Sequence, residues 1–191
     1  AEWTTPFVAD YNQPGTFYIG NSNVYQSTDN GVTFTMTSSL PTGNEISALA
    51  VSNSNSDVLV AAKRVRYEIG INGSVFITHD RGVNWIDITA GLPDTLYYTS
   101  VDINLSDENT MYIAMAGFVS GQKVYRSTDG GITWQNISYN LPNLPVNCIK
   151  NIPGTNDLLA ATDIGVYSFD NSLNTCIQTV VEGINTYIGG G

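Results

Sequence analysis

Ser127-Thr128-Asp129-Gly130-Gly131-Ile132-Thr133-Trp134 decides the fold, because the same octet, Ser/Thr-x-Asp-x-Gly-x-x-aromatic, occurs twice more in the chain. Residues 27–34 read STDNGVTF, and residues 78–85 read THDRGVNW. The Asp side chain can accept hydrogen bonds from backbone N–H groups of the turn that follows it. The Gly permits a positive φ, and the aromatic supplies apolar area that fixes the turn onto a core. Three copies in register therefore predict three equivalent turns.

The octets also set a period. Their aspartates, Asp29, Asp80 and Asp129, stand 51 and 49 residues apart, which indicates that a supersecondary unit of about 50 residues is repeated. A fourth, eroded copy keeps Asp170 but has Ser172 and Thr175 where the Gly and the aromatic belong, so we expect its turn to lack the aromatic anchor. The units agree outside the octet as well, in a Val-aromatic pair before it (Val24-Tyr25, Val75-Phe76, Val124-Tyr125) and a Leu-Pro pair after it (Leu40-Pro41, Leu92-Pro93, Leu141-Pro142).

Alternation and turn signals divide each unit into four short strands. The predicted strands are 4–10, 16–19, 23–27 and 33–37; 46–52, 57–63, 74–78 and 84–89; 99–105, 110–115, 123–127 and 133–138; and 146–152, 157–162, 165–169 and 176–181. Four-stranded antiparallel units of this length, with almost no helical periodicity, are typical of β-propeller blades. The sequence predicts an all-β fold, a single β-propeller over residues 1–191 with blades at 4–41, 45–93, 97–142 and 146–185.

In a propeller the first strand of each blade lines the central channel, where space is short. Small residues on the predicted first strands fit that place: Ala48, Ala50, Ser100 and Cys148. The octets then fall in turns between the third and fourth strands. The loops that join second to third strands, and one blade to the next, lie on the opposite face, which is where we expect a binding site.

Composition excludes some functions. Seventeen acidic and seven basic residues give a formal charge of −10, whereas phosphate binding needs clustered Lys and Arg, so nucleic acid is a poor partner. The apolar runs are strand-sized, so we expect no membrane span. The N-terminus lacks the layout of a signal peptide; if the protein is secreted, its signal was removed or lies upstream.

The two cysteines, Cys148 and Cys176, match no metal or redox spacing. They fall on the first and last strands of the fourth unit, which are separated by two strands at about 4.8 Å each, whereas a disulfide needs Cα atoms within about 7 Å. We expect two buried free thiols.

The single histidine, His79, lies inside an octet and is expected to be a surface turn residue. The sequence predicts no specific metal site and no cofactor.

The octets resemble Asp-boxes, also called bacterial neuraminidase repeats, which occur in sialidases, xyloglucanases, other endoglucanase propellers and sortilin-type receptors. The Leu-Pro endings resemble large secreted proteins of Bacteroidetes-type bacteria that carry a C-terminal (type IX) secretion-sorting domain. The resemblance implies a secreted or cell-surface protein in which the Asp-boxes are structural and lie away from the ligand. The residues to which it gives this structural role are Asp29, Gly31, Phe34, Asp80, Gly82, Trp85, Asp129, Gly131 and Trp134.

The longest loop of the expected binding face, residues 63–73, holds three of the seven basic residues. Arg64 and Arg66 could form a fork for a carboxylate or sulfate on a sugar. Alternatively, they are solvated or balance nearby acids such as Glu68. Aromatic residues on the same face could stack on sugar rings or contact a protein, or they pack between blades. These aromatic residues are Tyr67, Phe118, the pair Tyr97-Tyr98, and Tyr139, with Tyr98 placed lower because it could begin a strand.

Catalytic residues are not evident. Glycoside hydrolysis needs two carboxylates roughly 5 to 9.5 Å apart, or a Tyr nucleophile with an acid partner in sialidases. The arginine triad that the resemblance to sialidases would imply, spread over separate blades, is absent. The acids outside the octets stand singly or in turns and form no recognisable pair: Asp94, Asp102, Asp107, Glu108 and Asp163. The sequence predicts no catalytic residue.

Two functional hypotheses follow. The first is an extracellular bacterial propeller module that binds a carbohydrate or a protein, in an adhesion or accessory role, through the face opposite the octets. The alternative is half of a secreted glycoside hydrolase, sialidase- or xyloglucanase-like, whose catalytic acids lie outside this chain. Four blades leave two apolar sheet faces uncovered, so we expect either the remaining blades of a larger ring, with residues 182–191 opening a fifth blade, or a second copy to cover them.

Overall fold

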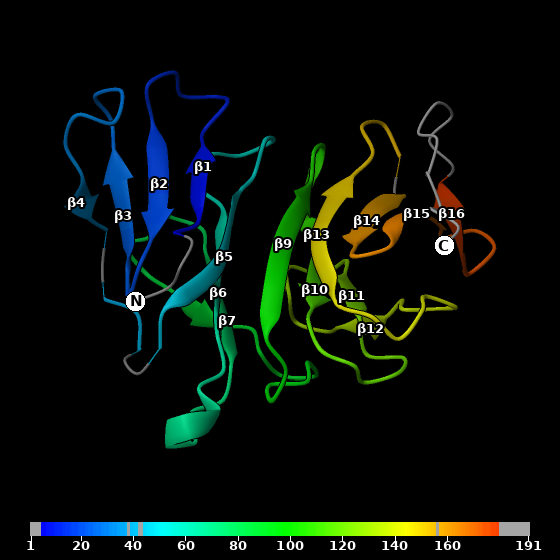
Figure 1. Ribbon diagram of the computed structural model, residues 1–191. Helices are drawn as coiled ribbons and strands as arrows, with labels where there is room; N and C mark the ends of the chain where they lie inside the picture. The colour runs from blue at the N-terminus through cyan, green and yellow to red at the C-terminus, as the bar shows by residue number, and fades with distance from the viewer. Residues whose placement is uncertain (1–4, 38, 42–43, 156, 180–191) are drawn as a thin grey trace, which may run out of the picture.

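The computed structural model describes residues 5–37, 39–41, 44–155 and 157–179. These residues form four sheets of four antiparallel strands each, taken in chain order and called blades 1 to 4 (Figure 1). Their strands are β1 Phe7–Ala9, β2 Phe17–Gly20, β3 Val24–Ser27 and β4 Thr35–Met36; β5 Ile46–Val51, β6 Leu59–Lys63, β7 Ser74–Thr78 and β8 Ile86–Asp87; β9 Tyr98–Asn104, β10 Asp107–Met115, β11 Val124–Ser127 and β12 Gln135–Asn136; and β13 Val146–Asn151, β14 Leu158–Thr162, β15 Gly165–Asp170 and β16 Thr175–Thr179.

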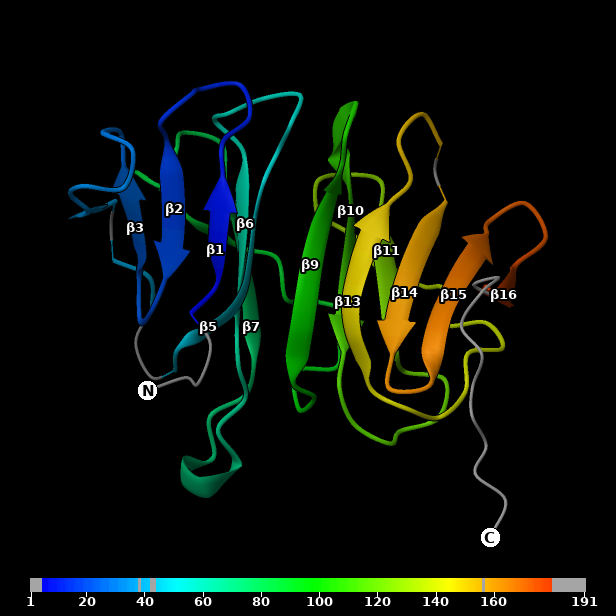
Figure 2. The same cartoon turned by 45° about the horizontal axis from the view of Figure 1, so that its top comes forward.

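Every strand pairs with its neighbours in sequence, so each blade is a simple antiparallel meander. The first strands β1, β5, β9 and β13 lie side by side along the middle of the molecule, and the blades fan outward from them as an open arc (Figure 2). The predicted all-β propeller architecture with four four-stranded blades is confirmed. The helical content of the described residues is one 3₁₀ turn, η1 Tyr67–Ile69, which is too short to cross a bilayer.

The fourth strands of blades 1 to 3 are shorter than predicted. Each has two residues and pairs with only two residues of the third strand. In blade 3 these pairs are Tyr125↔Asn136 and Arg126↔Gln135. The aromatic of the octet, which the sequence placed inside the fourth strand, therefore precedes that strand. In blade 4, where the octet is eroded, the last strand is five residues long and starts at Thr175.

The octet turns have the predicted geometry. The Asp129 Oδ1 atom accepts hydrogen bonds from the Thr133 backbone N–H (2.9 Å) and the Ser127 hydroxyl (2.7 Å). Ser127 Oγ in turn accepts the Gly131 N–H at 2.9 Å, and Gly131 has a φ of +87°. The octets at 27–34 and 78–85 repeat these contacts, which explains why the same three residue types recur.

The eroded turn of blade 4 uses its Asp differently. Asp170 Oδ1 accepts the backbone N–H groups of Ser172 (2.9 Å) and Leu173 (3.1 Å). The positive φ, +52°, has moved to Asn174, since Ser172 stands where the other turns have Gly. Asn tolerates this region better than most residues, so the turn survives without the Gly and the aromatic.

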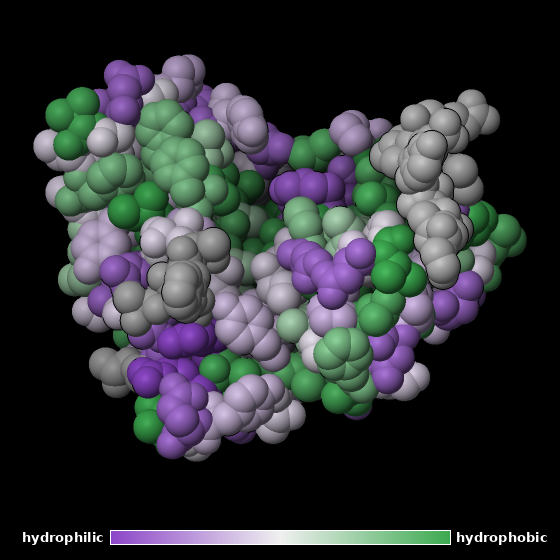
Figure 3. Space-filling model, viewed as in Figure 1, coloured by the Kyte–Doolittle hydropathy of each residue, from purple (hydrophilic) through white to green (hydrophobic). Residues whose placement is uncertain are grey.

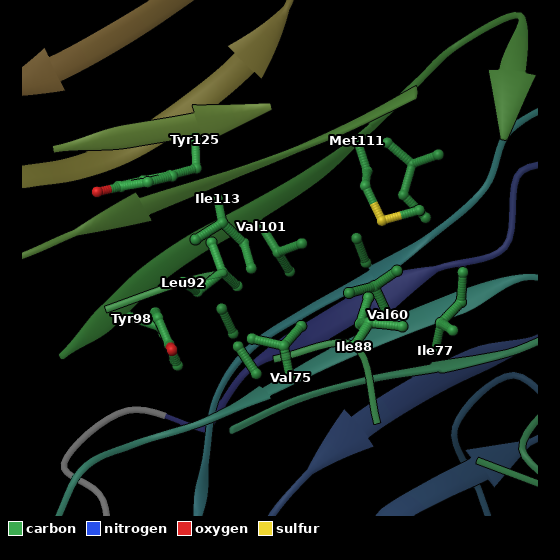
Figure 4. Close-up of a cluster of buried hydrophobic side chains, with 14 of the residues drawn as sticks. Val60, Val75, Ile77, Ile88, Leu92, Tyr98, Val101, Met111, Ile113 and Tyr125 are labelled. Atoms are coloured by element: carbon green, nitrogen blue, oxygen red, sulfur yellow. The ribbon is translucent and has the colours of Figure 1, made fainter. Parts of the chain in front are cut away.

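Three apolar clusters lie between successive blades, one at each junction. The Val-aromatic pair of each third strand divides its two side chains between two junctions. Val75 faces blade 3, in the cluster that also contains Tyr125 (Figure 4), whereas Phe76 faces blade 1. Because β-strand side chains alternate between faces, one dipeptide per blade serves both neighbours.

The cysteines are free, as expected, but only Cys176 is buried. Cys148 was predicted to be buried and is exposed. It lies on β13, on the face of blade 4 that points away from blade 3, and no described blade covers that face. The prediction was wrong because it assumed that every first strand has a neighbour on both sides. His79 is exposed in its octet, as predicted.

The octet aspartates predict a loss of stability in acid. Hydrogen bonds lower the pKa of Asp129 from 3.8 to about 2, first those from the Thr133 side chain and backbone and then that from Ser127. Hydrogen bonds within their own octets likewise lower the pKa of Asp29 and of Asp80 to about 2. Because the folded pKa lies below the ordinary one, the stabilisation is complete above 3.8 and is lost as the pH falls toward about 2.

We therefore expect the denaturant midpoint to stay level above pH 4 and to fall between about pH 4 and pH 2. Asp129→Asn should make this fall shallower, since one of the titrating groups is gone. An equally steep fall in Asp129→Asn would contradict the assignment.

Candidate functional site

The end of the blades opposite the octets carries the loop 63–73, which is folded back on itself (Figure 1). Arg66 and Ile71 exchange two backbone hydrogen bonds, of 2.7 and 3.1 Å, across η1. Gly70 closes the 3₁₀ turn with a left-handed φ of +67°. The loop is thus a small hairpin that projects from the junction of β6 and β7.

Three hydrogen bonds tie this hairpin to the linker between blades 2 and 3. The Tyr67 hydroxyl donates to the Thr95 carbonyl at 2.7 Å. Asn72 Nδ2 donates to Asp94 Oδ2 at 2.7 Å, and the Gly73 N–H to the Asp94 carbonyl at 2.6 Å. The hydrogen bond to Thr95 holds the Tyr67 hydroxyl, and 69% of the residue is exposed. The ring is therefore exposed in a fixed position.

Phe118 is presented from the equivalent loop of blade 3 and is also 69% exposed. Its carbonyl accepts the Asn143 side-chain amide at 2.8 Å. The preceding carbonyl, of Gly117, accepts Lys123 Nζ at 2.6 Å. The loop begins at Ala116, whose N–H donates to the Tyr97 carbonyl. We call Tyr67, Tyr97 and Phe118, with the linker 94–97, the loop platform.

Of the five aromatic residues predicted on this face, Tyr67 and Phe118 are exposed and Tyr97 is partly buried. The two arginines are not free. Arg64 pairs with Glu45 at 2.9 Å, and Arg66 pairs with Glu68 at 2.8 Å. The hydrogen bond from Arg66 lowers the pKa of Glu68 below its ordinary value. The alternative interpretation, in which Arg66 balances Glu68, matches the observed pair. An anion-binding role of Arg64 and Arg66 stays a prediction.

The two remaining aromatics of this face pack inward. Tyr98 is fully buried at the start of β9, as the sequence allowed. Tyr139 is partly buried, has a φ of +43°, and packs against Phe169 with ring centroids 6.1 Å apart. For these two residues the interpretation as blade packing is the right one.

Lys63 is a polar residue of this face that the sequence analysis did not single out. It is 1% exposed, and its Nζ donates to the carbonyls of Pro41 (2.6 Å) and Ser22 (3.2 Å) in blade 1. Burial lowers its pKa. A pocket of about 290 Å³ beside it is lined by Ser22, Asn23, Leu40, Asn44, Glu45, Lys63 and Arg66. The sequence feature that could have indicated a buried lysine is its position at the end of the otherwise apolar strand LVAAK.

A second hollow, the inner groove, has a volume of about 550 Å³ and lies along the first strands. Figure 3 shows the surface hollowed between blades 1–2 and blades 3–4. Asp102 lines it and accepts Lys150 Nζ at 2.6 Å and the Asn151 N–H at 2.7 Å. Tyr11 stands at its edge, 79% exposed. The groove lies where the sequence predicted a central channel lined by first strands, but its lining side chains, which come from four blades, were not predicted.

Each of the five acids that the sequence analysis considered accepts a hydrogen bond from a side chain. Asp94 accepts a hydrogen bond from the Asn72 side-chain amide, and Asp102 accepts one from Lys150 Nζ. Glu108 accepts a hydrogen bond from the Ser54 hydroxyl at 3.1 Å. Asp163 accepts a hydrogen bond from the Asn147 side-chain amide at 2.7 Å, and Asp107 accepts one from the Thr110 hydroxyl at 2.7 Å. Within the described ranges no three His, Cys, Asp or Glu side chains gather as metal ligands do.

Known proteins resemble this chain in sequence and in fold. Xyloglucanase Xgh74A of Acetivibrio thermocellus is 26% identical over 136 residues, which are 66% of this chain and 16% of that enzyme. The GH74 xyloglucanase of Xanthomonas campestris superimposes with a TM-score of 0.71 at 15% identity, over 91% of this chain and 30% of that one. The structure of YCF48 bound to D1 peptide superimposes with a TM-score of 0.59 at 11% identity, over 87% of this chain and 50% of that one. The chain thus spans a small part of the xyloglucanases that it matches.

The family model described as "Sortilin, neurotensin receptor 3" matches residues 22–151, which is more than half of the chain. The matched span runs from β3 through β13 and so includes blades 2 and 3 entire, with the octets at 27–34, 78–85 and 127–134. The structural likenesses agree with this match on the fold. The chain belongs to the sortilin (Vps10) family, and its four sheets are blades of a β-propeller.

Proposed function

We propose that this chain is the propeller part of an extracellular glycoside hydrolase of xyloglucanase type and contributes sugar-binding loops to it. The observation that carries the proposal is the 26% identity to Xgh74A over 136 residues. The catalytic carboxylates are then expected in other parts of that enzyme, since this chain matches only 16% of the length of Xgh74A. The octets fit the role of structural Asp-boxes in a secreted bacterial protein.

The loop platform supports a sugar ligand. Tyr67 and Phe118 expose aromatic rings on loops that are fixed by hydrogen bonds. A fixed, exposed ring can stack on the apolar face of a sugar without a large loss of side-chain entropy. The paired Arg66 and Glu68 stand next to Tyr67 and offer charged hydrogen-bonding groups for sugar hydroxyls.

The test is calorimetric titration of the 191-residue chain with xyloglucan oligosaccharides, combined with an assay for released reducing ends. We expect binding without cleavage. Tyr67→Ala and Phe118→Ala should each weaken binding about fivefold to tenfold, because each removes one stacking ring worth roughly 1 kcal/mol. The matched control is Tyr67→Phe, which keeps the ring and loses only the hydrogen bond to Thr95, and which should bind nearly as the parent does.

Two results would contradict this. If Tyr11→Ala abolished xyloglucan binding while both platform variants bound normally, the inner groove would be the site. If the chain bound no glucan, the role in xyloglucan recognition would be wrong.

A second candidate function is peptide binding. It is favoured by the match to the sortilin family and by the fold likeness to YCF48, whose structure contains a bound D1 peptide. The loop platform is equally exposed to a peptide, and aromatic residues are enriched in protein interfaces. Binding to a random peptide library in the absence of glucan binding would favour this second function.

A further inference from the structure

The pocket of about 290 Å³ beside Lys63 lies between blades 1 and 2. Its walls come from the turn before β3, from the linker between the two blades, and from the end of β6 with the loop that follows. Both blades are present in the described chain, so the pocket is a feature of an interior junction. It lies on the same face as the loop platform, since Arg66 of the loop 63–73 lines it.

Lys63 is a buried cation without a carboxylate partner. It is 1% exposed, and its Nζ donates to the carbonyls of Pro41 at 2.6 Å and Ser22 at 3.2 Å. An ammonium group has three N–H donors, so these two carbonyls leave one for another acceptor. None of the ion pairs among the described residues includes Lys63. A buried charge is costly unless an opposite charge neutralises it, and an anion in the pocket would therefore be stabilised.

The repeating blade does not require a lysine at this position. Lys63 stands opposite Ser74 at the end of β6. The residues in the corresponding place of blades 3 and 4 are Met115 and Thr162. Because two blades fold with an uncharged residue there, the architecture alone does not account for the buried charge.

The charged groups around the pocket leave one net positive charge. Arg64 neutralises Glu45, whose Oε2 lies 2.9 Å from both the Nε and a terminal nitrogen of the guanidinium. Arg66 contacts Glu68 through Nε at 2.8 Å, and a guanidinium has further N–H donors for a ligand. These two pairs are neutral, so the charge of Lys63 remains. One carboxylate would balance it, whereas an inorganic sulfate or phosphate dianion would leave an excess of negative charge.

The pocket is larger than a carboxylate alone requires. Its volume of about 290 Å³ is near the lower end for small-molecule sites, roughly 300 Å³. The uncharged lining includes the side chains of Asn23, Asn44 and Leu40. Asn23 Oδ1 accepts the Leu40 N–H at 2.8 Å, and Asn44 Nδ2 donates to two backbone carbonyls, so both amides are held in place. Side-chain amides can bind sugar hydroxyls, which favours a sugar ring as the carrier of the carboxylate.

We propose that this pocket, the Lys63 pocket, binds the carboxylate of a hexuronic acid residue. Lys63 and Arg66 supply one cation for each carboxylate oxygen, and charge-assisted hydrogen bonds of this kind are the strong ones. Asn23 and Asn44 then contact the ring hydroxyls. The sugar part of this assignment rests on the proposed role of this face in glycan binding, and it adds an acidic sugar to the neutral glucan expected on the loop platform.

The first test follows Lys63 itself. The chain has three lysines, so a sample labelled with ¹³C in lysine gives three sets of side-chain signals in the NMR spectrum. Titration with D-glucuronate or D-galacturonate at constant ionic strength should shift the Lys63 signals and leave those of Lys123 and Lys150 in place. Glucose and galactose, which lack the carboxylate, should shift none. Lys123 is the internal control, because it is equally buried but its Nζ donates to the Gly117 carbonyl of its own loop at 2.6 Å.

The second test compares variants by calorimetric titration with D-glucuronate. Arg66→Gln should weaken binding about tenfold, as expected for the loss of a charge-assisted hydrogen bond. Lys63→Met, which introduces the residue that blade 3 has in this place, should abolish binding. The matched control is Arg81→Gln, which removes the same charge from a similar pair with Asp57 (2.7 Å) on the octet side and should bind as the parent does. If Lys63→Met does not fold, Arg66→Gln and the NMR titration decide.

The Lys63 signals decide the outcome first. If neither uronate shifted them, or if all three lysines shifted equally, the Lys63 pocket would not be a carboxylate site. Sodium sulfate or glucose 6-sulfate binding as tightly as glucuronate would also overturn the assignment, since the pocket would then select any oxyanion. A chain that binds glucuronate at Lys63 but binds no xyloglucan would contradict the proposed function alone, and the reverse result would contradict only this inference.

Discussion

Trp134→Ala should destabilise the protein by about 2 to 4 kcal/mol, the upper end being a core-like truncation. Trp134 is only partly buried, so a full core truncation is not expected. However, its ring packs against the cluster between blades 2 and 3, and its Nε1 donates to the Ile88 carbonyl at 2.8 Å. The variant therefore loses apolar contact and a hydrogen bond to the preceding blade together.

Urea denaturation followed by circular dichroism measures this loss. Trp134→Phe keeps most of the apolar area and loses the hydrogen bond, so it should cost only about 1 kcal/mol. If Trp134→Ala and Trp134→Phe had the same effect, the hydrogen bond rather than the packing would dominate. If neither had an effect, the aromatic of the octet would not be an anchor.

Gly131→Ala should destabilise the fold by about 3 kcal/mol, and Gly31→Ala by only about 1 kcal/mol. Both glycines have a positive φ, +87° and +83°, which an alanine adopts only under strain. In addition, the new Cβ of Gly131→Ala would lie 2.6 Å from Ile88 Cδ1 and 2.9 Å from Ile88 Cβ, so blades 2 and 3 must separate slightly.

The comparison is made by urea denaturation of the two single variants, because a Cβ on Gly31 would meet nothing within 4 Å. Equal losses for the two variants would show that backbone strain alone accounts for the Gly that recurs in the octets. A larger loss for Gly31→Ala would contradict the assigned contact between Gly131 and Ile88.

The inner groove and the loop platform show what sequence reasoning reaches at a site. Tyr67 and Phe118 were found because their loops lie between recognisable second and third strands. The pairing of Arg64 with Glu45 was not found, because these residues meet only when the linker after blade 1 runs beside the end of β6. Likewise, Asp102 and Lys150 are 48 residues apart and meet across a blade junction.

What the sequence determined by itself is the repeating unit. In each octet an Asp side chain that accepts the backbone N–H four residues ahead and a Gly with a positive φ form the turn from contacts within the octet. The octet can therefore be read without knowing the rest of the fold. Strand alternation within a blade is equally local. The tertiary structure alone decided which faces are covered. Cys148 and Ser100 occupy equivalent positions on their strands, yet Cys148 is exposed and Ser100 contacts Ile149, because burial depends on whether another blade packs alongside.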